Sequence, residues 1–63
     1  MDKLSDDDVV MPWKAWLRAN DLSDSTGRRL LKAGKGPRVI QLSDRRRGVT
    51  RRENRRWQES RTV

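Results

Sequence analysis

Large apolar residues are sparse along this chain, and their first clear periodicity lies at Trp13, Trp16 and Leu17. This i, i+3, i+4 spacing places all three side chains on one face of a helix, which we expect to run from about residue 12 to residue 20. Pro12 suits the first helical position, where its missing N–H is not needed. We expect both indoles, and that of Trp57, to pack in the core instead of stacking on unpaired bases.

The polar stretch over residues 20–23 predicts a tight turn, followed by a second helix over residues 24–33. Ser23 or Asp24 offers an N-cap, and Gly34 offers a C-cap. Two helices joined by a four-residue turn form a helix-turn-helix unit.

The second helix has an apolar side at Leu30 and Leu31, which we expect to face inward. Thr26 or Gly27 is expected at the close approach to the first helix. The remaining polar positions are expected to face outward, and they are Asp24, Ser25, Arg28, Arg29 and Lys32.

Alternation of Ile40 and Leu42 with Gln41 predicts a short strand over residues 38–42. Residues 43–48 resemble a turn, and Val49 is expected to start a returning strand. The resulting β-hairpin is expected to carry three consecutive arginines at its tip, namely Arg45, Arg46 and Arg47.

Thr50 and Glu53 have the spacing of a capping box and predict a last helix over residues 51–60. Its one large apolar residue is Trp57. We therefore expect this helix to be held by a single anchor and to fray easily.

Charge divides the chain into two unequal parts. Residues 1–24 hold six Asp against Lys3, Lys14 and Arg18, a net charge of minus 3, whereas residues 25–63 have a net charge of plus 10. Arginine dominates the basic part, and its guanidinium forks onto phosphates and base edges. This pattern indicates a polyanionic partner, most simply nucleic acid.

Composition excludes several classes of function. The chain has neither cysteine nor histidine, so it lacks thiol nucleophiles, disulfides and the commonest acid–base side chain. We expect no enzyme activity, no cofactor and no metal, although Asp6, Asp7 and Asp8 are a weak candidate for a divalent cation. The absence of an apolar run or signal peptide predicts a cytoplasmic protein with no membrane contact. Residues 1–8 are expected to be a flexible acidic segment, and residues 9–61 a single domain.

Several motifs occur here in a particular order. They are Ser25-Thr26-x-Arg28-Arg29-Leu30-Leu31 before Gly34, then Gly36-Pro37, Val39-Ile40-Gln41-Leu42-Ser43, Arg45-Arg46-x-Gly48, Thr50-Arg51-x-Glu53 and Trp57-x-x-Ser60-Arg61. In this order they resemble the MerR-type winged-helix excisionases, or recombination directionality factors, and the AlpA-like small regulators. The resemblance covers about residues 10–61 and implies an α+β, mainly helical, winged helix-turn-helix fold. Many relatives carry tryptophan where this chain has Val49, which predicts a more lightly packed hairpin, and Arg55-Arg56 leaves the role of the last helix open.

The resemblance implies that the second helix enters the DNA major groove and that the hairpin acts as a wing. The expected contacts from the helix are Ser25, Thr26, Arg28, Arg29 and Lys32. Those from the wing are Arg45, Arg46 and Arg47. Further phosphate contacts are expected from Lys35, Arg38, Arg51 and Arg52.

The implied function is that of an excisionase, which binds repeated duplex sites cooperatively, bends DNA and promotes integrase-mediated excision. Head-to-tail self-association is expected, with Asp6, Asp7 and Asp8 of one copy meeting basic residues of the next. The alternatives are an AlpA-type transcriptional regulator and, from another class, a small inhibitor that binds an acidic host protein.

Overall fold

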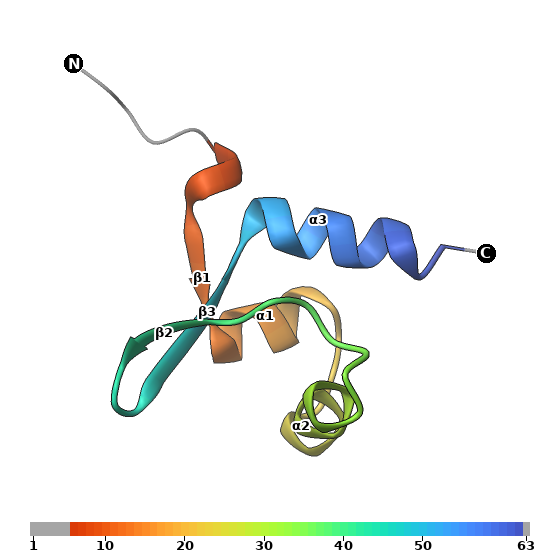
Figure 1. The fold of residues 1–63 in the computed structure, drawn as a ribbon, viewed down its shortest axis with the longest axis horizontal. Helices are drawn as coiled ribbons and strands as arrows, with labels where there is room; N and C mark the ends of the chain where they lie inside the picture. The colour runs from red at the N-terminus through yellow and green to blue at the C-terminus, as the bar shows by residue number, and fades with distance from the viewer. Residues whose placement is uncertain (1–5, 63) are drawn as a thin grey trace.

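The computed structural model describes residues 6–62, which form a small compact α+β fold (Figure 1). In chain order the elements are η1 (Asp6–Asp8, a 3-10 turn), β1 (Val10–Pro12), α1 (Trp13–Ala19), α2 (Asp24–Lys32), β2 (Ile40–Ser43), β3 (Arg46–Thr50) and α3 (Arg51–Ser60). The three expected α-helices are therefore confirmed. The strands form one antiparallel sheet in the order β1-β3-β2.

Local capping explains where α2 begins and ends and where α3 begins. The Ser23 hydroxyl accepts a hydrogen bond from the Thr26 N–H at 3.2 Å, and α2 ends in a Schellman motif at Gly34, whose φ is 72°. The Thr50 hydroxyl caps α3 by accepting from the Glu53 N–H at 3.1 Å. The expected capping box is only half present, because the Glu53 carboxylate instead lies 3.5 Å from the guanidinium of Arg56.

The sheet differs from expectation in three ways. Strand β2 spans Ile40–Ser43, whereas the sequence predicted a strand over residues 38–42. Strand β1 was not expected, and it ends at Pro12, which is the N-cap of α1 instead of its first helical residue. Strand β3 begins at Arg46, not at Val49, so only Arg45 lies in the turn while Arg46 and Arg47 extend along the strand. The expectation that all three arginines occupy the hairpin tip was therefore wrong.

The core is built around Trp16, Leu17 and Val49, which are 0%, 6% and 0% exposed. The half-buried apolar residues packed against it are Met11, Trp13, Leu22, Val39 and Trp57. Val49 fills the centre of the core from β3, whereas Ile40 and Leu42 of β2 are exposed. The lighter packing of the hairpin than in relatives stays a prediction. The predicted packing role of all three tryptophans is confirmed.

Close packing of α2 against α1 depends on Gly27, the one buried residue of α2. A Cβ atom at this position would lie 2.5 Å from Leu17 Cδ2 and 2.9 Å from Trp13 Cζ2. Leu30 and Leu31 are only half-buried, so the inward side of α2 is less deeply buried than its sequence suggests.

Helix α3 is attached by more than the single anchor expected. The Trp57 ring packs edge-on against Trp16 with centroids 5.2 Å apart, and its Nε1–H donates to the Lys35 carbonyl at 2.7 Å. Asn54 Oδ1 accepts hydrogen bonds from Trp16 Nε1 and Asn20 Nδ2. Gln58 Nε2 donates a hydrogen bond to Asn20 Oδ1. The helix is therefore connected to α1 and to the segment after α2.

None of the helices in residues 6–62 has the length and apolar character required to cross a membrane.

Candidate nucleic-acid interface

Helix α2 exposes the row of polar side chains that its periodicity predicts. Ser25, Thr26, Arg28, Arg29 and Lys32 are all exposed. The hydroxyls of the first turn form a local network, because Ser23 Oγ donates to Thr26 Oγ1 at 2.9 Å and lies 3.4 Å from Ser25 Oγ. This network stabilises the start of α2, and it holds the hydroxyls of Ser25 and Thr26 beside the positive end of the helix dipole.

The hairpin contributes its basic residues along one strand. Arg46 and Arg47 lie on β3, and Arg45 lies in the preceding turn. The Arg47 guanidinium carbon is 5.5 Å from the centroid of the Trp13 ring, within the range of a cation–π contact. Trp13 therefore holds a hairpin arginine against the start of α1.

Helix α2 and the β2–β3 hairpin face each other across an open hollow of about 590 Å³. The hollow is lined by Arg28 from α2, by Arg45, Arg46 and Arg47 from the hairpin, and by Lys14 from α1. A neighbouring hollow brings Arg28, Lys32 and Arg47 together. We call this surface the α2–hairpin face, defined by Lys14, Arg28, Lys32, Arg45, Arg46 and Arg47.

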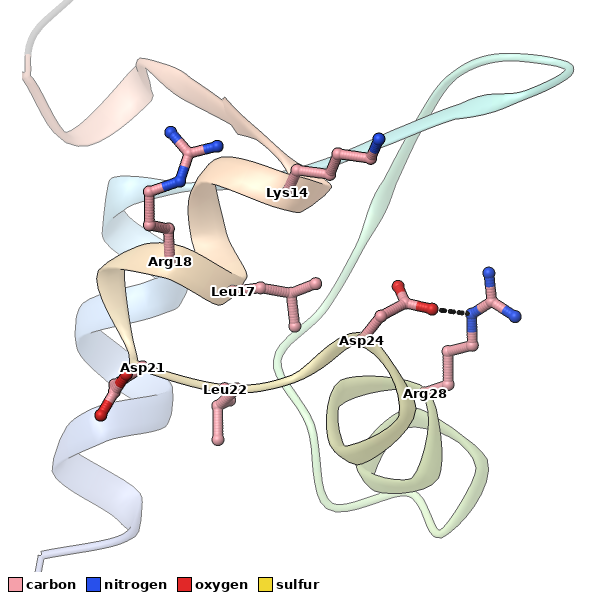
Figure 2. Close-up of a pocket in the computed structure, with 7 residues that line it drawn as sticks. All are labelled: Lys14, Leu17, Arg18, Asp21, Leu22, Asp24 and Arg28. Carbon is pink, nitrogen blue, oxygen red and sulfur yellow. Dashed lines mark ion pairs between the residues drawn. The ribbon is translucent and has the colours of Figure 1, made fainter.

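Figure 2 shows an adjacent hollow between α1 and α2, to which Lys14 and Arg28 of this face contribute. Lys14 extends from α1 toward the hairpin, whereas Arg18 points toward the opposite side. An ion pair joins Arg28 Nε to Asp24 Oδ2 at 2.9 Å. The other oxygen of Asp24 accepts a hydrogen bond from Trp13 Nε1 at 3.0 Å.

The remaining predicted residues lie elsewhere. Arg29, Ser25 and Thr26 are exposed on α2 but line neither of the hollows shared with the hairpin. Lys35 and Arg38 are exposed in the segment between α2 and β2. Their expected contacts with phosphates stay predictions.

The basic side of α3 is engaged by the acidic turn η1. Asp7 Oδ1 lies 2.6 Å from Arg55 Nη2, and Asp8 Oδ1 lies 3.2 Å from Arg52 Nη2. Within residues 6–62, no three acidic side chains are grouped to hold a metal ion. Residues 1–5 of the expected flexible segment lie outside the described part of the chain.

Helices α2 and α3 lie on opposite sides of α1 in both views (Figures 1 and 2). The two groups of arginines in the basic half are therefore separated: one belongs to the α2–hairpin face, and the other pairs with η1. Arg51 and Arg52 begin α3 and belong to the second group by position.

Sequence reasoning did not identify Lys14, Trp13 or Asp24 as parts of the interface. Asp24 and Arg28 do have the i, i+4 spacing of a helical ion pair, which was the available signal. The contacts of Trp13 with Asp24 and Arg47 depend on how α1, α2 and the hairpin are placed, and no local pattern reports that.

The α2–hairpin face combines fixed positive charge with hydrogen-bond donors, which suits a phosphate backbone and base edges. Within residues 6–62, Asp24 is the only carboxylate residue that lines its shared hollows. No protein-family model matches the chain, and no curated protein or solved structure is significantly similar to it.

Proposed function

We propose that this protein binds double-stranded DNA through the α2–hairpin face, as a winged helix-turn-helix module. The observation that carries the proposal is the convergence of Arg28 and Lys32 from α2 with Arg47 from β3 around one hollow. A polyanion that contacts one of these elements meets positive charge from the other. Positive charge from both elements therefore favours a ligand with an extended negative charge.

Helix α2 is the proposed element for the major groove. The groove is about 12 Å wide and admits one α-helix, and arginine reads guanine there with two hydrogen bonds. The exposed residues of α2 supply both guanidinium and hydroxyl donors.

The β2–β3 hairpin is the proposed wing. Its arginines extend along β3 and the turn, where they suit the negative potential of a narrow minor groove or the adjacent phosphates. Phosphate contacts of this kind position a protein on DNA without selecting a sequence.

We further propose that the DNA-binding activity is that of an excisionase. A single small module buries only about 600–1,000 Å² on DNA, which limits its affinity. Cooperative binding to repeated sites overcomes this limit, and bent DNA with several bound copies helps an integrase assemble. An AlpA-type regulator shares the same DNA contacts and differs in the location of its sites.

Head-to-tail contacts through the acidic segment require a rearrangement. Asp7 and Asp8 already pair with Arg55 and Arg52 of the same chain. Self-association through these residues therefore needs the two ion pairs to exchange for pairs with a neighbouring copy.

The first experiment is a gel-shift titration on random duplexes of about 200 base pairs at two salt concentrations, with sequencing of the retained fraction. We expect retention that falls steeply as the salt concentration rises. The logarithm of the binding constant falls linearly with the logarithm of the salt concentration, with a slope of about −0.9 for each phosphate neutralised. Enrichment of spaced repeats as a ladder of complexes supports the excisionase role, and enrichment of a single site supports a regulator. Absence of retention at about 0.1 M salt contradicts DNA binding and favours an acidic protein partner.

A matched pair of variants tests which face binds. Arg46→Ala removes a charge from the α2–hairpin face, and Arg55→Ala removes the same charge from α3. We expect Arg46→Ala to weaken binding to all sequences and to lower the salt slope by about 0.9, with little change for Arg55→Ala. Equal effects of the two substitutions would show that the face is assigned wrongly.

A further inference from the structure

Asp24 joins the core of the protein to the α2–hairpin face. Its Oδ1 accepts from Trp13 Nε1 at 3.0 Å, and its Oδ2 lies 2.9 Å from Arg28 Nε. We propose that Asp24 is a positioning residue that sets sequence specificity, by holding the Arg28 guanidinium end-on toward a guanine in the major groove. This inference rests on the proposed DNA-binding function.

The geometry of the ion pair leaves the recognition end of Arg28 available. Asp24 engages Nε, and Figure 2 shows the two terminal nitrogens of Arg28 pointing away from the carboxylate. Those two nitrogens form the pair of donors that matches guanine O6 and N7. A guanidinium held at Nε is therefore preorganised for a bidentate contact, whereas a free one must lose rotamer freedom when it binds.

Asp24 is itself held in place from two directions. It is the first residue of α2, directly after the Ser23 cap. The Trp13 indole that donates to it stacks on the fully buried Trp16 with ring centroids 5.1 Å apart. The position of Asp24 is thus fixed by the core and by the helix start.

Trp13 organises one arginine from each half of the face. It orients Arg28 through Asp24, and its ring lies 5.5 Å below the Arg47 guanidinium carbon. The spacing between a helix arginine and a hairpin arginine is therefore set by a single indole. Such a fixed spacing is what a regular duplex requires.

The ion pair has little value for stability alone. The side chains of Arg28 and Asp24 are 68% and 51% exposed, and exposed ion pairs of this spacing contribute little to the free energy of unfolding. A carboxylate on a phosphate-binding surface also repels the ligand. Removing the charge of Asp24 is therefore expected to raise the affinity for DNA and to lower the sequence specificity. A purely structural role would not produce these opposite changes.

The test compares Asp24→Asn with Asp21→Asn. Both changes remove one negative charge near α1, and asparagine tolerates the positive φ of 55° at residue 21. In the Asp24 variant the amide oxygen remains able to accept from Trp13, while the charge that holds Arg28 is lost. Dissociation constants are measured for the selected site and for duplexes in which each G·C pair is replaced in turn.

We expect both variants to bind random duplex slightly more tightly than the wild type. Only Asp24→Asn is expected to lose discrimination at one G·C position, by about fivefold or more, since a bidentate contact supplies about 1–3 kcal/mol of discrimination. Arg28→Ala is expected to lose discrimination at the same position, and the double variant to lose no more than Arg28→Ala alone.

Three results overturn the inference. They are unchanged discrimination in Asp24→Asn, equal losses in Asp21→Asn and Asp24→Asn, and losses at different base pairs in the Asp24 and Arg28 variants. A wild-type protein that does not bind duplex DNA contradicts the proposed function itself, so the two failures are distinguishable.

Discussion

The buried Trp16 indole donates a hydrogen bond from Nε1 to Asn54 Oδ1 at 2.9 Å, across 38 residues of chain. The same oxygen accepts from Asn20 Nδ2 at 3.0 Å. Trp16 is 0% exposed, so its indole N–H depends on an acceptor supplied by the protein. Asn54 therefore satisfies the polar atom of the largest core residue while attaching α3 to α1.

Asn54→Ala is expected to destabilise the protein by about 1–3 kcal/mol, the cost of leaving a buried donor unsatisfied. Each 1 kcal/mol corresponds to a fall in Tm of roughly 4–8 °C in a domain of this size. Urea denaturation followed by tryptophan fluorescence measures the change.

The control is Glu59→Ala, which truncates an exposed side chain on the same helix and is expected to change stability by less than about 0.5 kcal/mol. If Asn54→Ala is as mild as this control, the hydrogen bond does not hold α3.

Gly27→Ala is expected to lower stability even though it lies inside a helix. Alanine normally gains about 1 kcal/mol over glycine there. At this position its Cβ would lie 2.5 Å from Leu17 Cδ2, and forcing a packed core to adjust costs about 1–3 kcal/mol. We expect a net loss of about 1 kcal/mol in the same denaturation experiment.

Arg29→Ala is the matched substitution, because it places alanine at an exposed position of the same helix. We expect this variant to keep the wild-type stability to within about 0.5 kcal/mol. If Gly27→Ala were more stable than both the wild type and this control, α1 and α2 would have room to separate.

The helices could be predicted because their signals are local. Trp13, Trp16 and Leu17 lie within a single turn and a half, and Ser23 and Thr50 are followed three residues later by the N–H groups that they cap. Strand β1 has no comparable signal. It contains three residues, ends in proline, and pairs with a strand about 40 residues later.

The register of the hairpin also escaped prediction. An irregularity between Gln41 and Ser43 shifts the pairing, and consecutive arginines have no intrinsic preference for a strand. Arg46 and Arg47 are extended because they pair with Ser43 and Gln41 of β2 in this shifted register. The exposed residues of α2 were identified by periodicity, whereas the link through Trp13 and Asp24 needed the assembled fold.

Arg47→Lys and Arg47→Ala are expected to separate charge from stacking. Lysine keeps the positive charge, so the salt slope of DNA binding stays at the wild-type value, while alanine lowers it by about 0.9. Both lose the guanidinium stack on Trp13, which is worth about 0.5–1 kcal/mol at an exposed site. Titrations of one duplex at four salt concentrations give the slopes. A slope that falls equally for lysine and alanine would mean that Arg47 does not act through charge.

The double substitution Asp7→Asn/Asp8→Asn releases Arg55 and Arg52 from the acidic turn. Exposed ion pairs contribute about 0–1 kcal/mol each, so we expect only a small loss of stability. The released arginines lie on α3, on the far side of α1 from α2, and the Debye length at physiological salt is about 8 Å. DNA affinity at physiological salt is therefore expected to change by less than about threefold, with an unchanged salt slope. A slope that steepens by the equivalent of two phosphates would instead identify α3 as a second DNA-binding surface that η1 normally covers, and Arg52→Ala and Arg55→Ala in the same background would then restore the original slope.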